Sequence, residues 1–221
     1  MRLFPRTLLI VALTLIILIL FVNTVVIGVV GEQLNRLEEN NISRSMDRID
    51  SLLIKKMNVQ LAELRDNAHW DVTYHYLQDP TGGFVATYFV SGTFHYMNLN
   101  FVLLYDLNGT LVDMGGYDFE TGKLTAVSLE LTDYLHGHSF LLHHDGLDDD
   151  HQIISRIGDD VVMISTSPVL TTEETGPIMG SLVMGRVIDE REIGDLADEG
   201  DVSLEACAAF DQELPSDYIA A

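Results

Sequence analysis

The sequence predicts an α+β domain with one antiparallel sheet and helices on one of its faces. Apolar residues recur three or four positions apart from Glu32 to Gln78, which is helical spacing. Two apolar runs between Phe101 and Met114 bracket an Asn-Gly turn, which is a strong local signal for a β-hairpin. Strand-like segments follow from residue 152 to residue 188. A long helix followed by hairpins favours the α+β class.

The first element is an apolar stretch from Thr7 to Gly31 that contains no Asp, Glu, Lys, Arg or His. Because a helix needs about 20 apolar residues to cross a hydrocarbon core, the stretch predicts a transmembrane helix. A cleaved signal peptide is the alternative, but its apolar core is usually about 7–15 residues long. Basic residues precede the stretch at Arg2 and Arg6. The positive-inside bias therefore predicts a cytoplasmic N-terminus, residues 1–6, and an extracytoplasmic location for everything after Glu32.

The second element is the long helix expected over residues 32–78. No Gly or Pro interrupts it, and its apolar stripe is irregular for a strict heptad repeat. We expect the membrane-proximal half of this stripe to pair with the same helix of a second subunit. The distal half is expected to pack on its own domain. The sequence therefore predicts a homodimer formed through the long helix, which ends before Pro80.

The remaining elements follow from turn residues and short apolar runs. The aromatic-rich segment Phe84–Met97 fits either short helices or a strand. A short helix is expected at Leu124–Leu135 and a polar loop at His136–Asp150. Three strands are expected after the loop: Gln152–Ile157, Asp160–Ser167 and Met179–Ile188. Helical spacing returns at Asp189–Asp198, and a further strand is expected to start at Val202–Ala206.

Composition excludes two classes of protein. The chain has 34 Asp and Glu residues against 12 Lys and Arg residues, a formal net charge of −22. Because such a field repels phosphate backbones, no nucleic-acid partner is expected. The single cysteine, Cys207, excludes an intramolecular disulfide framework, so the fold must rest on its core.

Three separated blocks carry a resemblance to a known family. The first is Trp70-Asp71-Val72-Thr73-Tyr74, the second is the hairpin Asn100–Gly109, and the third is a Gly-Pro-x-x-Gly segment from Gly176 to Gly180 that runs into Gly185-Arg186. In this order after a transmembrane helix, they resemble the fourth CHASE family of cyclase- and histidine-kinase-associated sensing extracellular domains. The match spans roughly Leu34 to Ala209.

The resemblance implies a Cache- and PAS-like sensor over residues 32–209, with a central antiparallel sheet of about five strands. Similar domains are usually followed by a second transmembrane helix and a cytoplasmic HAMP, histidine kinase or diguanylate cyclase module. This sequence stops at Ala221 without either. Residues 210–221 are therefore expected to be a tail truncated before a second span. A cytoplasmic output module or partner kinase is expected to complete the receptor, as in two-component systems.

A small-molecule ligand is expected to bind between the end of the long helix and the sheet. Six residues are expected to contact it: Trp70, Asp71, Tyr74, His75, Tyr105 and Arg186. The first four lie at positions where residues three and four apart share a helix face. A structural alternative stays open, in which Trp70 and Tyr74 are core aromatics and Asp71 bonds nearby backbone. Arg186, a lone cation in an apolar strand, would then pair with Asp71 or another core carboxylate.

A metal site is the competing interpretation of the polar loop. Histidine and carboxylate side chains suit zinc and similar ions, and the loop is rich in both: His136, His138, His143, His144, Asp145, Asp148, Asp149, Asp150 and His151. Their spacing matches no fixed motif, however, and no His-Glu-x-x-His occurs. We therefore expect a solvated loop, with no metal site and no cofactor.

Three functions remain from these observations. The first is a non-enzymatic, membrane-anchored extracytoplasmic sensor that shifts its long helix within a dimer when a ligand binds. The second is a metal-dependent surface enzyme using the His/Asp-rich loop, and the third is a structural dimerising ectodomain. Because no nucleophile elbow, phosphate loop or dinucleotide fingerprint is present, no catalytic residue is expected and the sensor is preferred.

Overall fold

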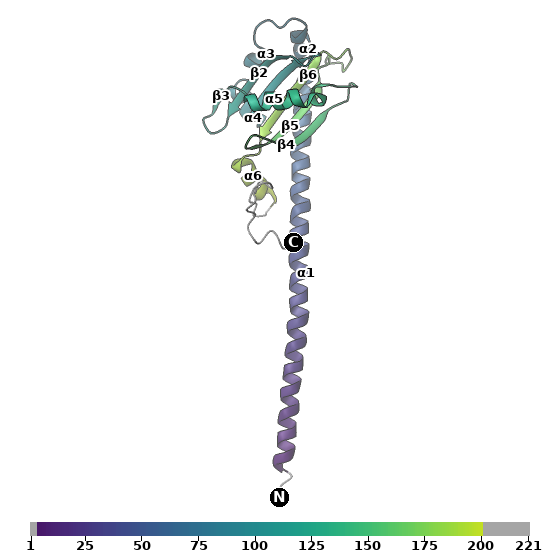
Figure 1. The fold of residues 1–221 in the computed structure, drawn as a ribbon, viewed down its shortest axis with the longest axis vertical. Coiled ribbons are helices and arrows are strands. Elements are labelled where there is room, and N and C mark those ends of the chain that lie inside the picture. The colour runs from purple at the N-terminus through teal and green to yellow at the C-terminus, as the bar shows by residue number, and fades with distance from the viewer. Residues whose placement is uncertain (1–3, 201–221) are drawn as a thin grey trace. The chain divides into compact units, whose positions relative to one another are not determined.

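The computed structural model describes the backbone of residues 4–200 and the side chains of residues 13–21, 23 and 44–199. By its internal contacts the chain divides into two units, Met1–Asp50 and Ser51–Ala221. The strand expected from Val202 and the tail at residues 210–221 lie outside the described residues. The second unit contains the sheet (Figure 1), and every pocket and cluster described below is lined by its residues.

The first unit is part of helix α1 (Phe4–Ala68). Eight large apolar side chains between Leu13 and Phe21 are each 53–66% exposed in this helix. Within the part of the chain that the structure describes, no helix is both long enough and apolar enough to span a membrane. The transmembrane segment expected at residues 7–31 stays a prediction.

The long helix ends earlier than the sequence pattern predicts. Helix α1 stops at Ala68, and a separate helix α2 (Asp71–Gln78) starts after Trp70, which has an extended backbone. Two hydrogen bonds, one tertiary and one local, explain the break. The Leu170 N–H donates to the Ala68 carbonyl oxygen at 3.1 Å, and the Thr73 hydroxyl donates to the Asn67 carbonyl oxygen at 2.6 Å. These donors satisfy carbonyls that a continuing helix would have used.

Helices α3 (Phe84–Tyr88) and α4 (Ser91–Tyr96) fill the segment that fitted either short helices or a strand. Helix α5 (Leu129–Gly137) starts later than expected, because Ser128 caps it by accepting a hydrogen bond from the Leu131 N–H at 3.2 Å. A 3₁₀ helix η1 (Ser139–Leu142) lies inside the segment expected to be a loop. Helix α6 (Glu190–Gly200) confirms the last predicted helix.

The sheet has six strands in the order β3-β2-β1-β6-β5-β4, and all pairings are antiparallel. The strands are β1 (Phe101–Asp106), β2 (Leu111–Asp118), β3 (Lys123–Thr125), β4 (His151–Ile157), β5 (Asp160–Pro168) and β6 (Gly180–Val187). The predicted hairpin and the three later strands are confirmed. The additional strand is β3, a three-residue exposed edge at the start of the segment expected to be helical.

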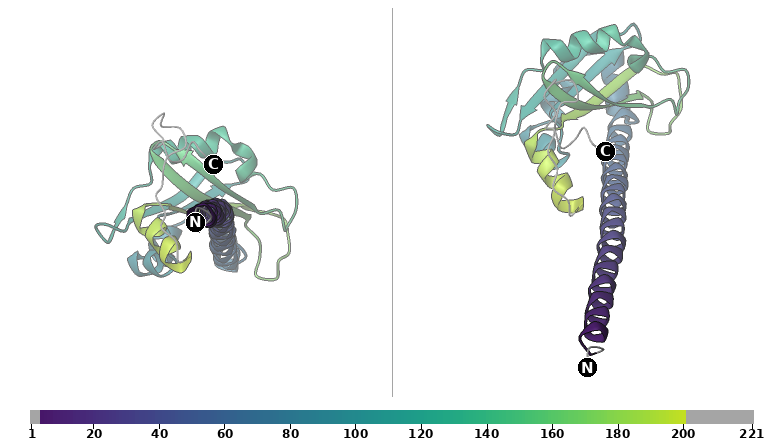
Figure 2. Two further views of the ribbon diagram at one scale, coloured as in Figure 1. Left: turned by 90° about the horizontal axis from the view of Figure 1, so that it is seen from below. Right: turned by 60° about the horizontal axis from the view of Figure 1, so that its bottom comes forward.

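Helices cover both faces of the sheet, not one (Figure 2). Residues 51–68 of α1, with α2, α3 and α4, cover one face, which we call the α1 face; α5 and η1 cover the other, the α5 face. Val102 and Leu104 of β1 belong to the first core, while Phe101, Leu103 and Tyr105 belong to the second. All five are buried, so β1 lacks the apolar–polar alternation that would have indicated one solvated face.

One motif glycine has a clear packing role. A Cβ at Gly185 in β6 would overlap the ring of Phe101 and the carbonyl oxygen of Met163. The Phe101 ring therefore covers this glycine on the α5 face, next to Arg186 on the opposite side of the strand.

Candidate functional site

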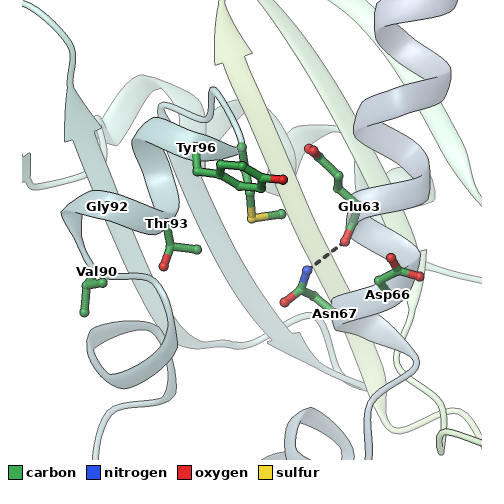
Figure 3. A pocket seen from close by; sticks show the side chains of 8 residues that line it. Glu63, Asp66, Asn67, Val90, Gly92, Thr93 and Tyr96 are labelled. Carbon is green, nitrogen blue, oxygen red and sulfur yellow. Dashed lines mark hydrogen bonds between the residues drawn. The ribbon is translucent and has the colours of Figure 1, made fainter.

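A pocket of about 490 Å³ lies between α1 and α4, and we call it the α1–α4 pocket (Figure 3). Helix α1 supplies Glu63, Asp66 and Asn67, which share a face because they are three and four positions apart. The other side is formed by the segment around α4: Val90, Gly92, Thr93, Tyr96 and Met97. None of these eight described residues carries a positive charge.

Glu63 is the unusual side chain of this pocket. Its Oε2 atom is buried and has no hydrogen-bond partner among the residues that the structure describes. Burial raises the pKa of the Glu63 carboxyl; the Arg186 charge opposes that rise and the Asp66 charge adds to it. A buried acceptor without a donor is costly. A ligand that brings an N–H group or a positive charge would therefore be favoured here.

Aromatic and apolar groups complete the α1–α4 pocket. Tyr96 is 87% exposed and Val90 is 50% exposed, so both are accessible to a ligand. Tyr96 offers a ring face of the kind that binds ammonium groups. Two carboxylates, a phenol ring and apolar walls together suit a small organic cation.

A buried polar network lies beside the pocket and contains Arg186. The Arg186 Nε donates to Gln60 Oε1 at 3.1 Å, and its Nη1 lies 3.5 Å from Glu192 Oε1. Gln60 in turn donates through Nε2 to the hydroxyl of Ser165 at 3.0 Å. Arg186, Gln60 and Glu192 are 5%, 0% and 1% exposed. The structural alternative for Arg186, pairing with a core carboxylate, is confirmed, and the partner is Glu192 instead of Asp71. Ligand contact by Arg186 stays a prediction.

Glu192 connects three elements within this network. Its Oε1 accepts from Lys56 Nζ of α1 at 2.9 Å, and its Oε2 accepts from Asn98 Nδ2 at 3.0 Å. Burial on its own would raise the pKa of the Glu192 carboxyl, but the Lys56 hydrogen bond and the charges of Arg186 and Lys56 lower the pKa overall. Glu192 is therefore ionised at neutral pH and holds α6 against α1 and β6.

The pocket and the network meet at Glu63. A smaller cavity of about 240 Å³ shares Glu63, Tyr96 and Met97 with the α1–α4 pocket and is also lined by Lys56 and Arg186. The Arg186 charge acts on the Glu63 carboxyl. A change of charge in the pocket therefore also acts on Arg186 in the network.

The predicted residues at the end of the long helix are divided between the core and the surface. Tyr74 is 6% exposed in the core, and the Trp70 ring packs edge-on against Tyr88 with centroids 4.9 Å apart. Asp71 is exposed and exchanges two hydrogen bonds with Thr172: its N–H donates to Oγ1 at 3.1 Å, and its Oδ1 accepts from the Thr172 N–H at 2.9 Å. These contacts fit the structural alternative for all three residues.

Asp71 and His75 also line a second pocket, which we call the α2–α3 pocket. It measures about 560 Å³ and lies between these two helices, with Tyr76, Asp79 and Tyr88 among its lining residues. His75 Nδ1 lies 3.0 Å from the side-chain oxygen of Gln78. Ligand contact by Asp71 and His75 stays a prediction for this pocket.

The last two predicted residues lie elsewhere. Tyr105 is fully buried on the α5 face, where burial raises the pKa of its phenol to about 12. Arg186 contacts Gln60, ten residues before Trp70 and thus about 15 Å away along a helix. The structure therefore distributes the six residues over three places. Tyr105 is separated because successive strand residues face opposite sides of the sheet.

Sequence reasoning missed Glu63, Asp66 and Tyr96. On a helix, Glu63 and Asp66 look like ordinary charges on a solvated face, and nothing local shows that α4 will lie opposite them and that Glu63 will be partly buried. The available signal was indirect: two carboxylates three positions apart beside the apolar stripe.

The comparisons with known proteins agree with this architecture. The model of the CHASE4 domain matches residues 53–206. No curated protein sequence matches the chain. Among solved structures, the periplasmic domain of LuxQ from Vibrio cholerae aligns with a TM-score of 0.51 and 11% identity, covering 72% of this chain and 70% of that one.

Two further structures align less well. The extracellular domain of vpHK1S-Z8, assigned as a histidine kinase, gives a TM-score of 0.45 at 17% identity and covers 72% of this chain and 60% of that one. A domain from Vibrio parahaemolyticus assigned to the sensory box/GGDEF family gives 0.37 at 14% identity, covering 66% and 62%.

The LuxQ alignment supports the α+β fold alone, because its sequence identity is low. The match to the CHASE4 model is stronger, since it spans more than half of the chain and contains the three blocks of the predicted resemblance. The chain therefore belongs to the CHASE4 family of extracytoplasmic sensor domains.

Proposed function

We propose that this domain senses a small organic cation, which binds in the α1–α4 pocket, for a membrane-anchored receptor of the histidine kinase or cyclase type. Membership of the CHASE4 family supports the sensory role. The observation that carries the ligand class is the buried Glu63 Oε2 atom, which has no described hydrogen-bond partner in a pocket lined by two carboxylates and no cation. An ammonium group would satisfy that oxygen and offset its burial.

Signalling would start from the contacts that surround Glu63. A bound cation draws Glu63 and Asp66 of α1 toward α4 and weakens the pull of Glu63 on Arg186. The strength of the Arg186–Glu192 ion pair then changes, and the contacts that this network makes among α1, β6 and α6 change with it. A ligand moves such an equilibrium only by binding one arrangement more tightly than the other. The readout would be a shift of α1 within a homodimer, relayed to a cytoplasmic output module or partner kinase.

Anchoring through residues 7–31 completes the proposal. The exposed side chains from Leu13 to Phe21 surround the helix without a polar face, and a helix that is apolar all round needs an apolar environment. The chain should stay with the membrane pellet after alkaline extraction, and the detergent-solubilised chain should sediment as a dimer. Release into the supernatant contradicts the anchor, and a monomer contradicts the signalling route.

Thermal unfolding of the detergent-solubilised chain tests the ligand site. Choline, ethanolamine, agmatine and spermidine would be compared with acetate, succinate and phosphate. At 100 times its dissociation constant a ligand adds about 2.7 kcal/mol of stability, which raises Tm by roughly 5–10 °C for a chain of this size. We expect such a rise with at least one cation and with none of the anions.

Matched variants test which of the two pockets binds the cation. Glu63→Gln and Asp66→Asn keep the shape of the α1–α4 pocket and should abolish most of the rise in Tm. His75→Ala, in the α2–α3 pocket, should leave it unchanged. The proposal fails if no cation raises Tm, or if His75→Ala removes the rise while Glu63→Gln retains it.

A further inference from the structure

A cluster of metal-ligating side chains lies away from both pockets, in the segment after η1 and at the first residue of β4. His144, Asp149 and His151 each offer one ligand atom, and these atoms all lie within 4.8 Å of one another. The sequence pattern predicted a solvated loop here, but His144 is only 9% exposed. The fold therefore gathers residues that the linear spacing left unconnected.

The hydrogen bonds of His144 prepare it for coordination. Its Nδ1 lies 2.5 Å from the Asp149 carbonyl oxygen, and its Nε2 lies 2.9 Å from the Ser181 hydroxyl. Because a carbonyl can only accept, Nδ1 carries the proton and Nε2 keeps the lone pair. A histidine that donates one ring N–H to a backbone carbonyl is the usual outer-shell arrangement of a metal ligand.

The other two candidate ligands are also held in place. Asp149 Oδ2 accepts a hydrogen bond from the Asp145 N–H at 2.7 Å, and the His151 Nε2 lies 3.2 Å from the His143 carbonyl oxygen. The rings of His144 and His151 stack with centroids 5.3 Å apart and an angle of 11° between planes. Donors on a tetrahedral zinc ion lie about 3.4 Å apart, as its bond lengths of about 2.0–2.1 Å require. Small side-chain rotations would close the group onto an ion.

An independent feature next to the cluster favours a cation. The Asp150 side chain is only 7% exposed, and its Oδ1 is buried without a hydrogen-bond partner among the described residues. Its other oxygen pairs with Arg65 of α1. Buried carboxylate oxygens are normally satisfied. A divalent ion on the neighbouring ligands would place positive charge beside this unsatisfied oxygen.

We propose that His144, Asp149 and His151 form a site for a divalent transition-metal ion of the zinc type. Two imidazole nitrogens and one carboxylate favour Zn²⁺, Co²⁺ or Ni²⁺ over Ca²⁺ and Mg²⁺, which prefer all-oxygen ligands. The ion would replace the Ser181 hydroxyl as the partner of His144 Nε2, and it would lie beside the Asp150–Arg65 ion pair to α1. The site shares no residue with the α1–α4 pocket, so it does not depend on the proposed sensor ligand.

Titration of the full chain with metal alone tests this proposal. The chain would carry no histidine tag, would be solubilised in detergent and would be stripped with a chelator. Calorimetry with ZnCl₂ should show one ion per chain, and thermal unfolding should show a higher Tm with Zn²⁺ than with Ca²⁺. Replacement by Co²⁺ should give the visible absorption of a site with nitrogen and oxygen ligands. Absence of stoichiometric Zn²⁺ binding overturns the proposal.

Variants distinguish the cluster from its surroundings. His151→Ala and Asp149→Asn, both at partly exposed positions, should weaken Zn²⁺ binding at least about 100-fold, beyond the 10–100-fold typical of outer-shell changes. His144→Ala should do the same, and the two partly exposed variants keep the test valid if its buried site unfolds. The matched controls His143→Ala and His136→Ala should bind normally, as should Glu63→Gln. Unchanged binding in both His151→Ala and Asp149→Asn, or its loss in His143→Ala, overturns the assignment.

Discussion

The two faces of the sheet bury different kinds of side chain. The α5 face is an apolar core in which side chains such as Leu103, Leu135 and Ile164 are fully buried. The α1 face also has an apolar core, but it carries Gln60, Ser165, Arg186 and Glu192 in one buried hydrogen-bonded network beside the α1–α4 pocket. Stability can come from either face, whereas, among the residues that the structure describes, only the α1 face pairs buried charge with an accessible cavity.

This difference shows where a ligand could change the fold. The stability of an apolar core depends on the volume of its side chains, and their close packing leaves few alternative arrangements. The free energy of a buried ion pair depends on charge as well, so a new charge nearby can strengthen or weaken the pair. The α1 face therefore suits signalling, and the α5 face suits a fixed support. The predictions below test this division, beginning with the largest expected effect.

Breaking the buried pair should have the largest effect. Arg186→Leu leaves Glu192 with less compensation and Gln60 Oε1 without its donor. Removing one partner of a buried ion pair typically costs about 3–5 kcal/mol. We expect a loss of this size in the free energy of unfolding, measured by urea denaturation.

The double variant Arg186→Leu, Glu192→Leu supplies the control for the buried pair. Because it removes both charges, it should be more stable than Arg186→Leu, although Lys56 and Asn98 lose their acceptor. A double variant less stable than the single variant would show that Arg186 contributes through packing and not through charge.

The local parts of this fold were readable from sequence, and the long-range parts were not. The β1–β2 hairpin and strands β4, β5 and β6 follow from apolar runs bounded by turn residues. The break after Ala68 depends on the N–H of Leu170, about a hundred residues later, so no local pattern contains it. Helices on both faces were missed because a strand buried on both sides shows no alternation.

The candidate site was predictable to a similar extent. Arg186 stood out as a lone cation in an apolar strand, and a carboxylate partner was expected for it. That partner is Glu192, on a helix that the pattern placed without indicating where it packs. Glu63 gave only the indirect signal of a second carboxylate three positions away, since its environment is created by α4. Trp70 and Tyr74 drew attention as motif residues, but the structure uses both in packing.

A smaller effect is expected from the pH dependence at Glu63. Its folded-state pKa is raised above 4.5 by burial, so the folded state holds the proton more tightly than the unfolded state. Stability linked to Glu63 is then fully present below pH 4.5 and is lost as pH rises through the folded pKa. Glu63→Gln should therefore be more stable than the natural sequence at pH 7.5 and equal to it near pH 4.

Urea denaturation at both pH values measures this difference. Glu120→Gln, at an exposed residue of the β2–β3 turn, is the matched control for removing one negative charge from an acidic chain. If Glu63→Gln and Glu120→Gln stabilise equally at pH 7.5, relief of general charge repulsion explains the result, and the special environment of Glu63 is contradicted.

The smallest effect is expected on the α5 face, at Tyr105. Its hydroxyl is buried without a hydrogen-bond partner among the described residues, and burial raises its pKa to about 12. Tyr105→Phe removes an unsatisfied polar atom and keeps the ring, so the free energy of unfolding should rise, by less than about 1 kcal/mol. In an alkaline titration followed by ultraviolet absorbance, Tyr105→Phe should lack the ionisation step at the highest pH, because the Tyr105 phenol ionises only near that pKa.

Tyr105→Phe also separates the two faces directly. If the α5 face is only a support, the rise in Tm given by an organic cation should be the same in Tyr105→Phe and in the natural sequence. Loss of that rise would place Tyr105 among the ligand contacts, as the sequence pattern predicted. Since the ring stays in place and only one oxygen is removed, such a loss could not be attributed to repacking, and the division between a signalling face and a supporting face would be wrong.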